Sequence, residues 1–310
     1  MNFIKKYKLR IFFLLLFLGA FLGRSYYWLT DGFTNSNILS AYPSDARWEP
    51  TRIHEGDFEI ANAILDQEFS YFSKGCQSYV FISQDKNYVL KFFKNQRYQT
   101  KPWVKLFSFI PKVNQYRLSR SAHKDRKRES LFESIRIAYD NLQKETGLVF
   151  IHLNKKREFA KKVSLIDKIG QKMEIPIDEY EFFIQKKALM LTDVIEEQIK
   201  GFKWEESKLL LKNLLTLLLK EHEKGISDED PALMQNTGVY QGEPIHVDVG
   251  QFVLNEKYKK EKVSKQALFE KFYKFRHWLV DKNKDLANYF DGLLDEEFGA
   301  SFFDQVSKYE

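Results

Sequence analysis

Residues 69–93 read FSYFSKGCQSYVFISQDKNYVLKFF, a stretch dense in β-forming side chains. Three segments rich in Phe, Tyr, Val and Ile are separated by Lys74-Gly75 and by residues 84–87, which are typical turn residues. This pattern predicts a three-stranded β-meander. The first turn carries Gly75, and the third strand carries Lys91.

The chain on either side of this meander extends the pattern. A basic and aromatic insert, residues 95–120, is followed by residues 124–144, whose apolar side chains recur at helical spacing. Further strand-like stretches lie at residues 146–153, 162–168 and 180–187. The first half of the protein is therefore predicted to contain five or six strands around one amphipathic helix.

The second half has a helical pattern. Residues 204–224 read WEESKLLLKNLLTLLLKEHEK, with acidic residues at the beginning and Gly225 directly after the end. Helical spacing returns after residue 263. The predicted fold class is α+β, with a strand-rich half followed by a helix-rich half.

Composition supports an ordered protein. Of its 310 residues, 44% are hydrophobic and 30% are charged, and there are only 7 Pro and 14 Gly against 28 Phe. The single cysteine, Cys76, excludes an intramolecular disulfide and any multi-cysteine metal site. The net charge of +6 is interleaved with acidic residues, so we expect no nucleic acid partner.

The N-terminus has the pattern of a membrane-targeting segment. Residues 11–23 read IFFLLLFLGAFLG and follow a basic stretch that contains Lys5, Lys6, Lys8 and Arg10. The apolar run is shorter than the roughly 20 residues that span a bilayer, so both a cleaved signal peptide and an uncleaved anchor are compatible with it.

An uncleaved anchor is the interpretation we favour. Arg24 makes cleavage after Ser25 unfavourable, and Tyr26, Tyr27 and Trp28 have the character of a membrane-interface belt. The sequence thus predicts a single-pass membrane protein, and the positive-inside rule places the N-terminus in the cytoplasm. The predicted organisation is listed in chain order: a basic cytoplasmic tail at 1–10, a transmembrane anchor or signal peptide at 11–29, a linker at 30–55, a strand-rich lobe with inserts at 56–190, and a helical lobe at 191–310.

Three motifs suggest chemistry. In the first, the turn at Gly75 would let backbone N–H groups approach a phosphate, and Lys91 would supply a fixed positive charge. A glycine turn and a lysine on a strand are also common in proteins that bind no phosphate. This motif alone is therefore weak.

The second motif is KGISDEDPALMQN, residues 224–236. Asp228 and Asp230 flank Glu229, and clustered carboxylates repel one another unless they bind a cation or a proton. A solvated acidic turn is the alternative interpretation. Asn236 follows Asp230 by six residues.

The third motif is PIHVDVGQF, residues 244–252. Asp248 lies at the end of an apolar strand, with Val249 and Gly250 after it. A carboxylate in this position is suited to hold Mg²⁺ against phosphate oxygens, although many strand-terminal aspartates only form turns.

Taken together, the order and context of these motifs resemble the protein kinase-like superfamily over residues 68–255. The resemblance implies a two-lobed fold with ATP and Mg²⁺ between a strand-rich lobe and a helical lobe. It assigns Gly75 to the glycine-rich loop, Lys91 to the phosphate-binding lysine and Asp230 to the catalytic base. Asn236 and Asp248 become the metal ligands.

The departures from the family pattern define the alternatives. Asp228 competes with Asp230 for the role of base, and Asn236 lies one residue beyond the usual spacing. Glu129 and Glu133 are both candidates to pair with Lys91. The short C-terminal part is more similar to small-molecule and lipopolysaccharide-type kinases than to protein kinases.

Two functions follow from the resemblance. The first is a membrane-anchored phosphotransferase that moves the γ-phosphate of ATP to a hydroxyl-bearing acceptor. The second is a pseudokinase that acts as a membrane-associated binding or scaffold module. The charge rule places the domain across the membrane, where ATP is scarce, and this conflicts with the first function.

Overall fold

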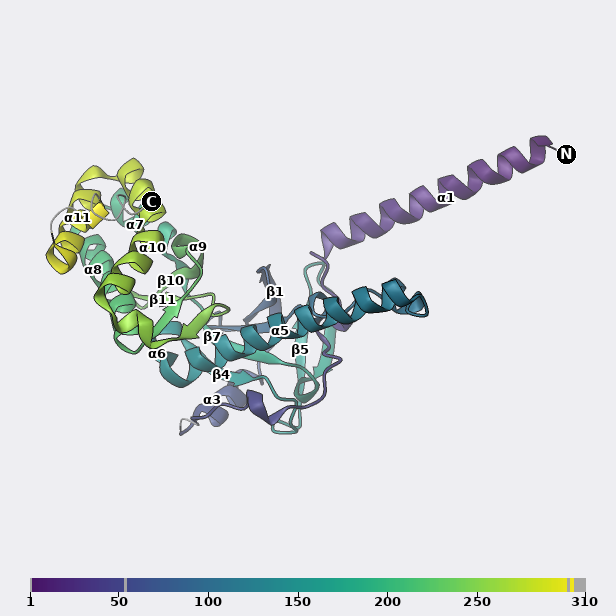
Figure 1. The fold of residues 1–310 in the computed structure, drawn as a ribbon, viewed down its shortest axis with the longest axis horizontal. Coiled ribbons are helices and arrows are strands. Elements are labelled where there is room, and N and C mark those ends of the chain that lie inside the picture. The colour runs from purple at the N-terminus through teal and green to yellow at the C-terminus, as the bar shows by residue number, and fades with distance from the viewer. Residues whose placement is uncertain (1, 53–54, 300–301, 304–310) are drawn as a thin grey trace.

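The computed structural model describes residues 2–52, 55–299 and 302–303. It has a curled seven-stranded sheet, a separate helical part and one long N-terminal helix that extends away from both (Figure 1). The predicted α+β class and the order of a strand-rich and a helix-rich half are confirmed. The last residues of the predicted helical lobe, 304–310, lie outside the described residues.

The large sheet has the strand order β4-β7-β3-β2-β1-β5-β6. Neighbouring strands are antiparallel except for β1 and β5, which are parallel. Its strands are β1(Phe69–Lys74), β2(Ser78–Ser83), β3(Tyr88–Phe93), β4(Leu148–His152), β5(Lys162–Ile166), β6(Lys172–Pro176) and β7(Phe182–Lys186). The predicted meander is confirmed as β1, β2 and β3, whereas the sequence pattern did not predict β6.

Strand register places two different sets of side chains on the two faces of this sheet. Phe81 pairs with Leu90, and Leu90 with Ile184; all three are fully buried and belong to one hydrophobic core. Side chains alternate along each strand, so the next residues point to the opposite face.

Residues directly after the N-terminal helix cover the core of the sheet. Phe33 is 2% exposed and packs on Tyr79 and Phe81, with ring centroids 5.3 and 5.0 Å apart. Ile38 is also fully buried. The short elements here are α2(Asn35–Ile38) and the 3₁₀ helix η1(Ala46–Trp48). Much of the segment that the sequence presents as a linker therefore contributes to the folded core.

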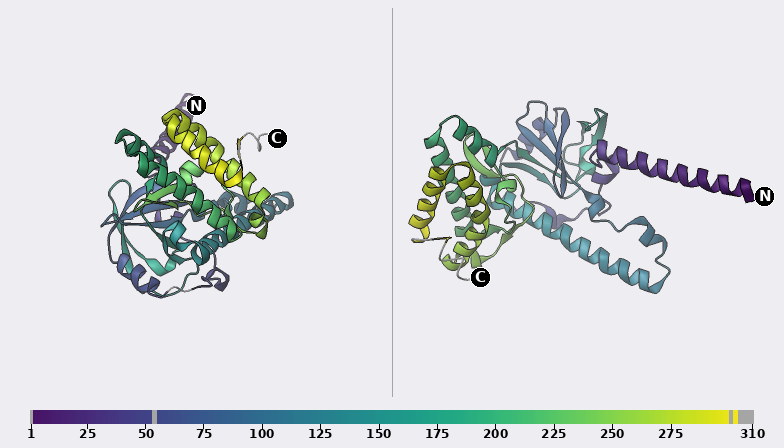
Figure 2. Two further views of the ribbon diagram at one scale, coloured as in Figure 1. Left: turned by 90° about the vertical axis from the view of Figure 1, so that its left-hand side faces the viewer. Right: turned by 90° about the horizontal axis from the view of Figure 1, so that it is seen from above.

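Helix α5(Pro111–Asn141) begins 13 residues before the helix predicted at 124. Its second half carries buried apolar residues that pack against β4 and β7, whereas its first half extends beyond the sheet together with α4(Pro102–Leu106) (Figures 1 and 2). A helix without a buried face has no apolar stripe, and hydrophobic periodicity therefore could not detect this first half. The remaining helices beside the sheet are α3(Asp57–Ile64) and α6(Gln143–Thr146).

The helical part is built around the leucine-rich helix predicted at 204–224. It consists of α7(Leu191–Lys200), α8(Trp204–Glu223), α10(Glu261–Lys282) and α11(Lys284–Phe298). Gly225 follows α8 with a φ of +68°, which is the left-handed conformation favoured after a helix C-terminus. Leucines of α8 pack against phenylalanines of α10 and α11 in a second core.

Short strands connect the helical part to the sheet. One small sheet has the order β11-β10-β8, from β8(Leu189–Met190), β10(Thr237–Tyr240) and β11(Glu243–His246). A second pairs β9(Ile226–Asp228) with β12(Phe252–Leu254), and the one-turn helix α9(Leu233–Asn236) lies between β9 and β10. Strands β10 and β11 form an antiparallel hairpin between residues 236 and 248.

Helix α1(Asn2–Leu29) extends away from the rest of the protein (Figure 1). Its residues Arg10–Leu29 are long and apolar enough to cross a membrane, and none of this span is buried against the protein. A signal sequence meets the same criteria of length and composition. The structure thus supports one N-terminal membrane-directed helix.

Candidate functional site

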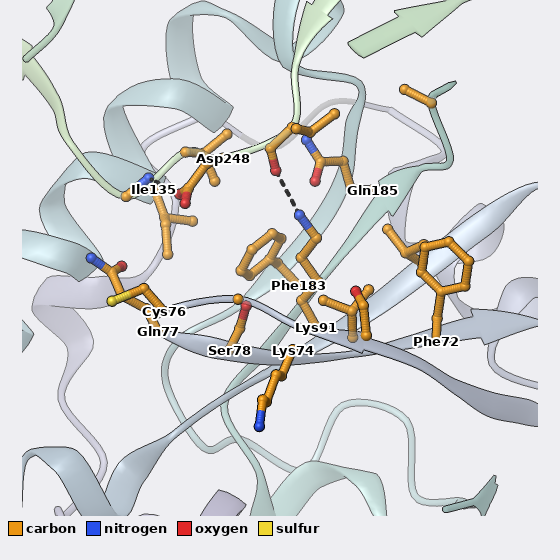
Figure 3. A pocket seen from close by; sticks show the side chains of 18 of the residues that line it. Phe72, Lys74, Cys76, Gln77, Ser78, Lys91, Ile135, Phe183, Gln185 and Asp248 are labelled. Atoms are coloured by element: carbon orange, nitrogen blue, oxygen red, sulfur yellow. Dashed lines mark hydrogen bonds between the residues drawn. The ribbon is translucent and has the colours of Figure 1, made fainter. Parts of the chain in front are cut away.

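A cavity of about 240 Å³ lies between the large sheet and the segment that follows β11 (Figure 3). Strand register builds its wall, because Val80 pairs with Lys91 and Lys91 pairs with Phe183, so that these three side chains share one face of the sheet. The β1–β2 turn, the second half of α5, residues 186–188, Met190 and Gln235 also contribute to the lining. The lining includes Gly75, Lys91 and Asp248, three of the six residues that the sequence selected.

Lys91 is the central charged group of the cavity. Its ammonium group donates a hydrogen bond of 2.6 Å to the carbonyl oxygen of Val247, a residue 156 positions later in the chain (Figure 3). Burial disfavours the charged form and lowers the pKa of Lys91 to about 8, although the nearby Asp248 carboxylate acts in the opposite direction. Lys91 thus connects the sheet to the 247–250 segment. A bound anionic ligand would stabilise the charged form of this lysine.

Neither acidic residue proposed to pair with Lys91 does so. Glu129 lies 3.3 Å from Arg47, and Glu133 lies 2.8 Å from Arg136. The residues of α5 that line the cavity are Leu131 and Ile135. A separation of two residues rotates a side chain by about 200° around a helix, which turns Glu133 away from the face that carries Leu131 and Ile135.

The β1–β2 turn is held in place by cations from the segment after β3. Lys94 bonds to the carbonyl oxygen of Gly75, and Arg97 bonds to that of Cys76. Burial, reinforced by the charges of Lys74 and Arg97, lowers the pKa of Lys94 to about 8. Additional negative charge beside this turn would therefore be stabilised electrostatically.

The segment containing Asp248 is anchored to α5. Ser134 donates a 2.7 Å hydrogen bond to the carbonyl oxygen of Val249 and accepts one of 2.6 Å from the backbone N–H of Phe252. The Asp248 carboxylate is exposed and accepts a 3.0 Å hydrogen bond from the backbone N–H of Gly250. A Cβ at Gly250 would lie 2.5 Å from Oε1 of Gln77, so any larger residue here would displace the Gln77 side chain of the β1–β2 turn.

The loop at 228–236 supplies a different residue from the one expected. Asn236 is 7% exposed and does not line the cavity; its backbone carbonyl accepts the N–H of Val247 at 2.7 Å. Its neighbour Gln235 is exposed and does line the cavity. Gln235 follows Asp230 by five residues. This is the usual spacing between the base and the metal-binding residue in the kinase-like pattern, so that spacing could have identified Gln235.

The two candidate bases lie outside this cavity and differ in their surroundings. Asp228 is 4% exposed and lies 3.3 Å from the ammonium group of Lys271, on α10. Asp230 is half-buried, and its carboxylate accepts hydrogen bonds from the backbone N–H of Ala232 at 3.0 Å and from the side chain of Gln251 at 2.8 Å. Asp228 also accepts the backbone N–H of Asp230 at 3.1 Å, which fixes the loop between them.

A buried polar network supports the rear of the cavity. Gln185 lines the cavity and donates to the carbonyl oxygen of His246 at 2.8 Å, and His246 lies 2.6 Å from the Glu221 carboxylate. Burial alone would lower the pKa of His246, but the Glu221 carboxylate outweighs it and raises that pKa. The network joins β7, α8 and β11 behind the site.

The charge of the lining is mainly positive. Four lysines, Lys74, Lys91, Lys186 and Lys187, contribute to it, against the single carboxylate of Asp248. Lys74 points to the side of the strands opposite Lys91 (Figure 3) and lies 2.8 Å from Asp31. The side facing Lys91 combines apolar walls, a cation and one exposed carboxylate, which suits an anionic ligand with an apolar portion.

Comparisons with known proteins do not assign the chain to a family. No protein-family model matches it, and no curated protein has a similar sequence.

Proposed function

We propose that the protein is a membrane-associated phosphotransferase of the protein kinase-like type, which transfers the γ-phosphate of ATP to a hydroxyl group. In this proposal the seven-stranded sheet and α5 form one lobe, and the helical part forms the other. The observation that carries it is the convergence of Lys91, Asp248 and the β1–β2 turn on one cavity from distant parts of the chain.

The cavity has suitable surfaces for a nucleotide. Val80, Val89 and Met190 offer apolar contacts for a base, and Lys91 offers a positive charge for phosphate oxygens. Mg²⁺ prefers oxygen ligands and is commonly held by one or two protein groups together with substrate phosphates. Asp248 and Gln235, rather than Asn236, are the residues of the lining that fit this role. The metal ion would neutralise negative charge on the phosphates.

Asp230 is the better candidate for the general base. Its carboxylate is half-buried and is held by neutral N–H donors. The Asp228 carboxylate is paired with Lys271 in the interior, and this pairing favours a structural role. Asp230 would accept the proton of the acceptor hydroxyl, and Asp228 would hold the loop in position.

A binding or scaffold function is the second candidate, and specific contacts favour it. Active protein kinases require an ion pair between the strand lysine and a helix glutamate. Here Lys91 instead donates to the Val247 carbonyl, and both candidate glutamates have arginine partners. A nucleotide-binding protein without phosphotransfer would have the same cavity.

Turnover of the full-length chain in lipid nanodiscs separates the two functions. We expect Mg²⁺-dependent ATP hydrolysis or transfer by the wild type, a loss of about 10²-fold or more in Asp248→Ala, and a fall in rate with little change in nucleotide affinity in Asp230→Asn. Asp281→Asn, at an exposed site on α10, is the matched control. Nucleotide binding without turnover in the wild type would support the scaffold function, and equal turnover in all four proteins would remove these residues from the mechanism.

A further inference from the structure

The connection between α4 and α5 presents an exposed apolar tip. Leu106 and Phe109 are 71% and 77% exposed, and the neighbouring Phe107 and Ile110 are also exposed. A soluble surface seldom places four large apolar side chains next to one another at the end of a projecting element. We call residues 101–120 the α4–α5 hairpin.

The charge of the hairpin is entirely positive. Residues 101–120 contain five Lys or Arg and no Asp or Glu. Lys105 and Lys112, on either side of the apolar tip, are exposed. Apolar side chains flanked by lysines and arginines are typical of elements that lie in the interface of an anionic bilayer.

The position of the hairpin agrees with this chemistry. The hairpin extends from the sheet on the same side as α1, and the helical part lies at the opposite end of the protein (Figures 1 and 2). Its base is fixed by Tyr42, whose hydroxyl group donates a 2.6 Å hydrogen bond to Asp125 of α5. The chain that follows α1 therefore also fixes the orientation of α5 relative to the sheet.

We propose that the α4–α5 hairpin is a second membrane contact, which inserts Leu106, Phe107, Phe109 and Ile110 into the headgroup and acyl boundary of an anionic bilayer. A stable protein interface buries roughly 800 Å² on each partner. A tip of four apolar side chains flanked by Lys105 and Lys112 suits lipid better than such an interface. This surface is additional to the proposed phosphotransfer site and requires no catalytic activity.

The proposal has a consequence for the cavity. Helix α5 is continuous from Pro111 at the tip to Ser134, which holds the 248–250 segment. At 1.5 Å per residue, these two positions are about 35 Å apart along the helix. A hairpin seated in the bilayer would therefore hold the cavity at a fixed height above the lipid surface.

Spin-label accessibility in the full-length chain tests the proposal. In a Cys76→Ser background, a nitroxide is attached at Phe109→Cys or, as a control of equal exposure, at Phe202→Cys between α7 and α8; Phe109 is 77% and Phe202 76% exposed. The protein is studied in nanodiscs of phosphatidylcholine with phosphatidylglycerol. We expect the label at 109 to be several-fold more accessible to oxygen, relative to a water-soluble nickel chelate, than the label at 202.

Each outcome decides the proposal. High chelate accessibility at 109, equal to that at 202, would overturn it, and so would low accessibility to both reagents, because that result indicates a protein contact. In a variant that carries both Lys105→Glu and Lys112→Glu, we expect the ratio of oxygen accessibility to chelate accessibility at residue 109 to fall several-fold. Helix α1 is retained in every sample, and no nucleotide is added, so the result is independent of the phosphotransfer proposal.

Discussion

Helix α1 and the first half of α5 differ sharply from the residues that follow each of them along the chain. Both elements project from the protein with exposed side chains, yet Phe33 lies in the sheet core a few residues after α1, and Phe132 is fully buried in the second half of α5. Exposure and burial thus meet within single continuous segments. Phe33 follows the last residue of α1, Leu29, by only four positions, and Phe132 lies in the same helix as the projecting first half of α5, so each projecting helix is joined closely to a hydrophobic core.

Truncation at two different positions should have the largest effect on stability. Removing residues 1–29 deletes an exposed helix, and we expect a folded protein that is soluble without detergent. Removing residues 1–55 also deletes Phe33, Ile38 and Trp48, and each such loss from a core costs about 2–5 kcal/mol. Because total stability is roughly 5–15 kcal/mol, we expect the shorter chain not to fold.

Circular dichroism and thermal unfolding of both fragments provide the measurement. Two fragments of equal stability would show that residues 30–55 are only a linker, as the sequence pattern predicted.

Two arginines of α5 sharpen the comparison between its halves. Arg128 is buried and lies 2.7 Å from the Glu181 carboxylate, whereas Arg120 is exposed. Arg128→Met leaves a buried carboxylate unpaired and should cost about 3–5 kcal/mol. Arg120→Met should change stability by less than about 0.5 kcal/mol. Urea unfolding midpoints measure both changes, and similar values for the two variants would contradict the account.

Substitution of two serines of α5, one anchoring residue and one control, should have a smaller effect on stability. Ser134→Ala removes both hydrogen bonds that hold residues 249 and 252 and should cost about 1–3 kcal/mol. It should also weaken nucleotide binding, because Asp248 lies in the anchored segment. Ser119→Ala, at an exposed position in the first half of the same helix, should change neither quantity. Unaltered nucleotide affinity in Ser134→Ala would remove this anchor from the description of the site.

The pH dependence of binding should show the smallest effect. The pKa of Lys91 is lowered to about 8 in the ligand-free protein, so raising the pH through this value removes the charge that attracts phosphate. We expect nucleotide affinity to fall above about pH 8, and Lys91→Met to lack this decline. The stability of the ligand-free protein should change in the opposite direction. Between about pH 8 and 10.5, Lys91 is protonated in the unfolded chain but not in the folded chain, so the free energy of unfolding rises with pH. Calorimetry across pH 7–9.5 measures the binding effect.

Local patterns predicted the elements whose side chains alternate between water and a core. The meander, the leucine-rich helix and the apolar strand before Asp248 were each predicted from a local pattern, and each is present. The first half of α5 could not be predicted in this way because it has no buried face. For residues 30–49, the core is built by contacts with distant strands, and a few separated apolar residues show no period.

The same reasoning explains the candidate site. Strand register placed Lys91 in the cavity, and the end of a strand placed Asp248 there, so both followed from local sequence. The choice between Gln235 and Asn236 depended on the path of a one-turn helix after Pro231. The ion pair of Asp228 depended on Lys271, more than 40 residues later, and no local pattern could predict it.

Calorimetric titration of the full-length protein in nanodiscs with Mg²⁺-ATP tests the central claim most directly. We predict binding at pH 7 that is weakened at least tenfold in Lys91→Met and retained in Lys144→Met, which changes an exposed lysine of α6 away from the cavity. Absence of binding by the folded wild type, or equal affinity in both variants, would contradict the account.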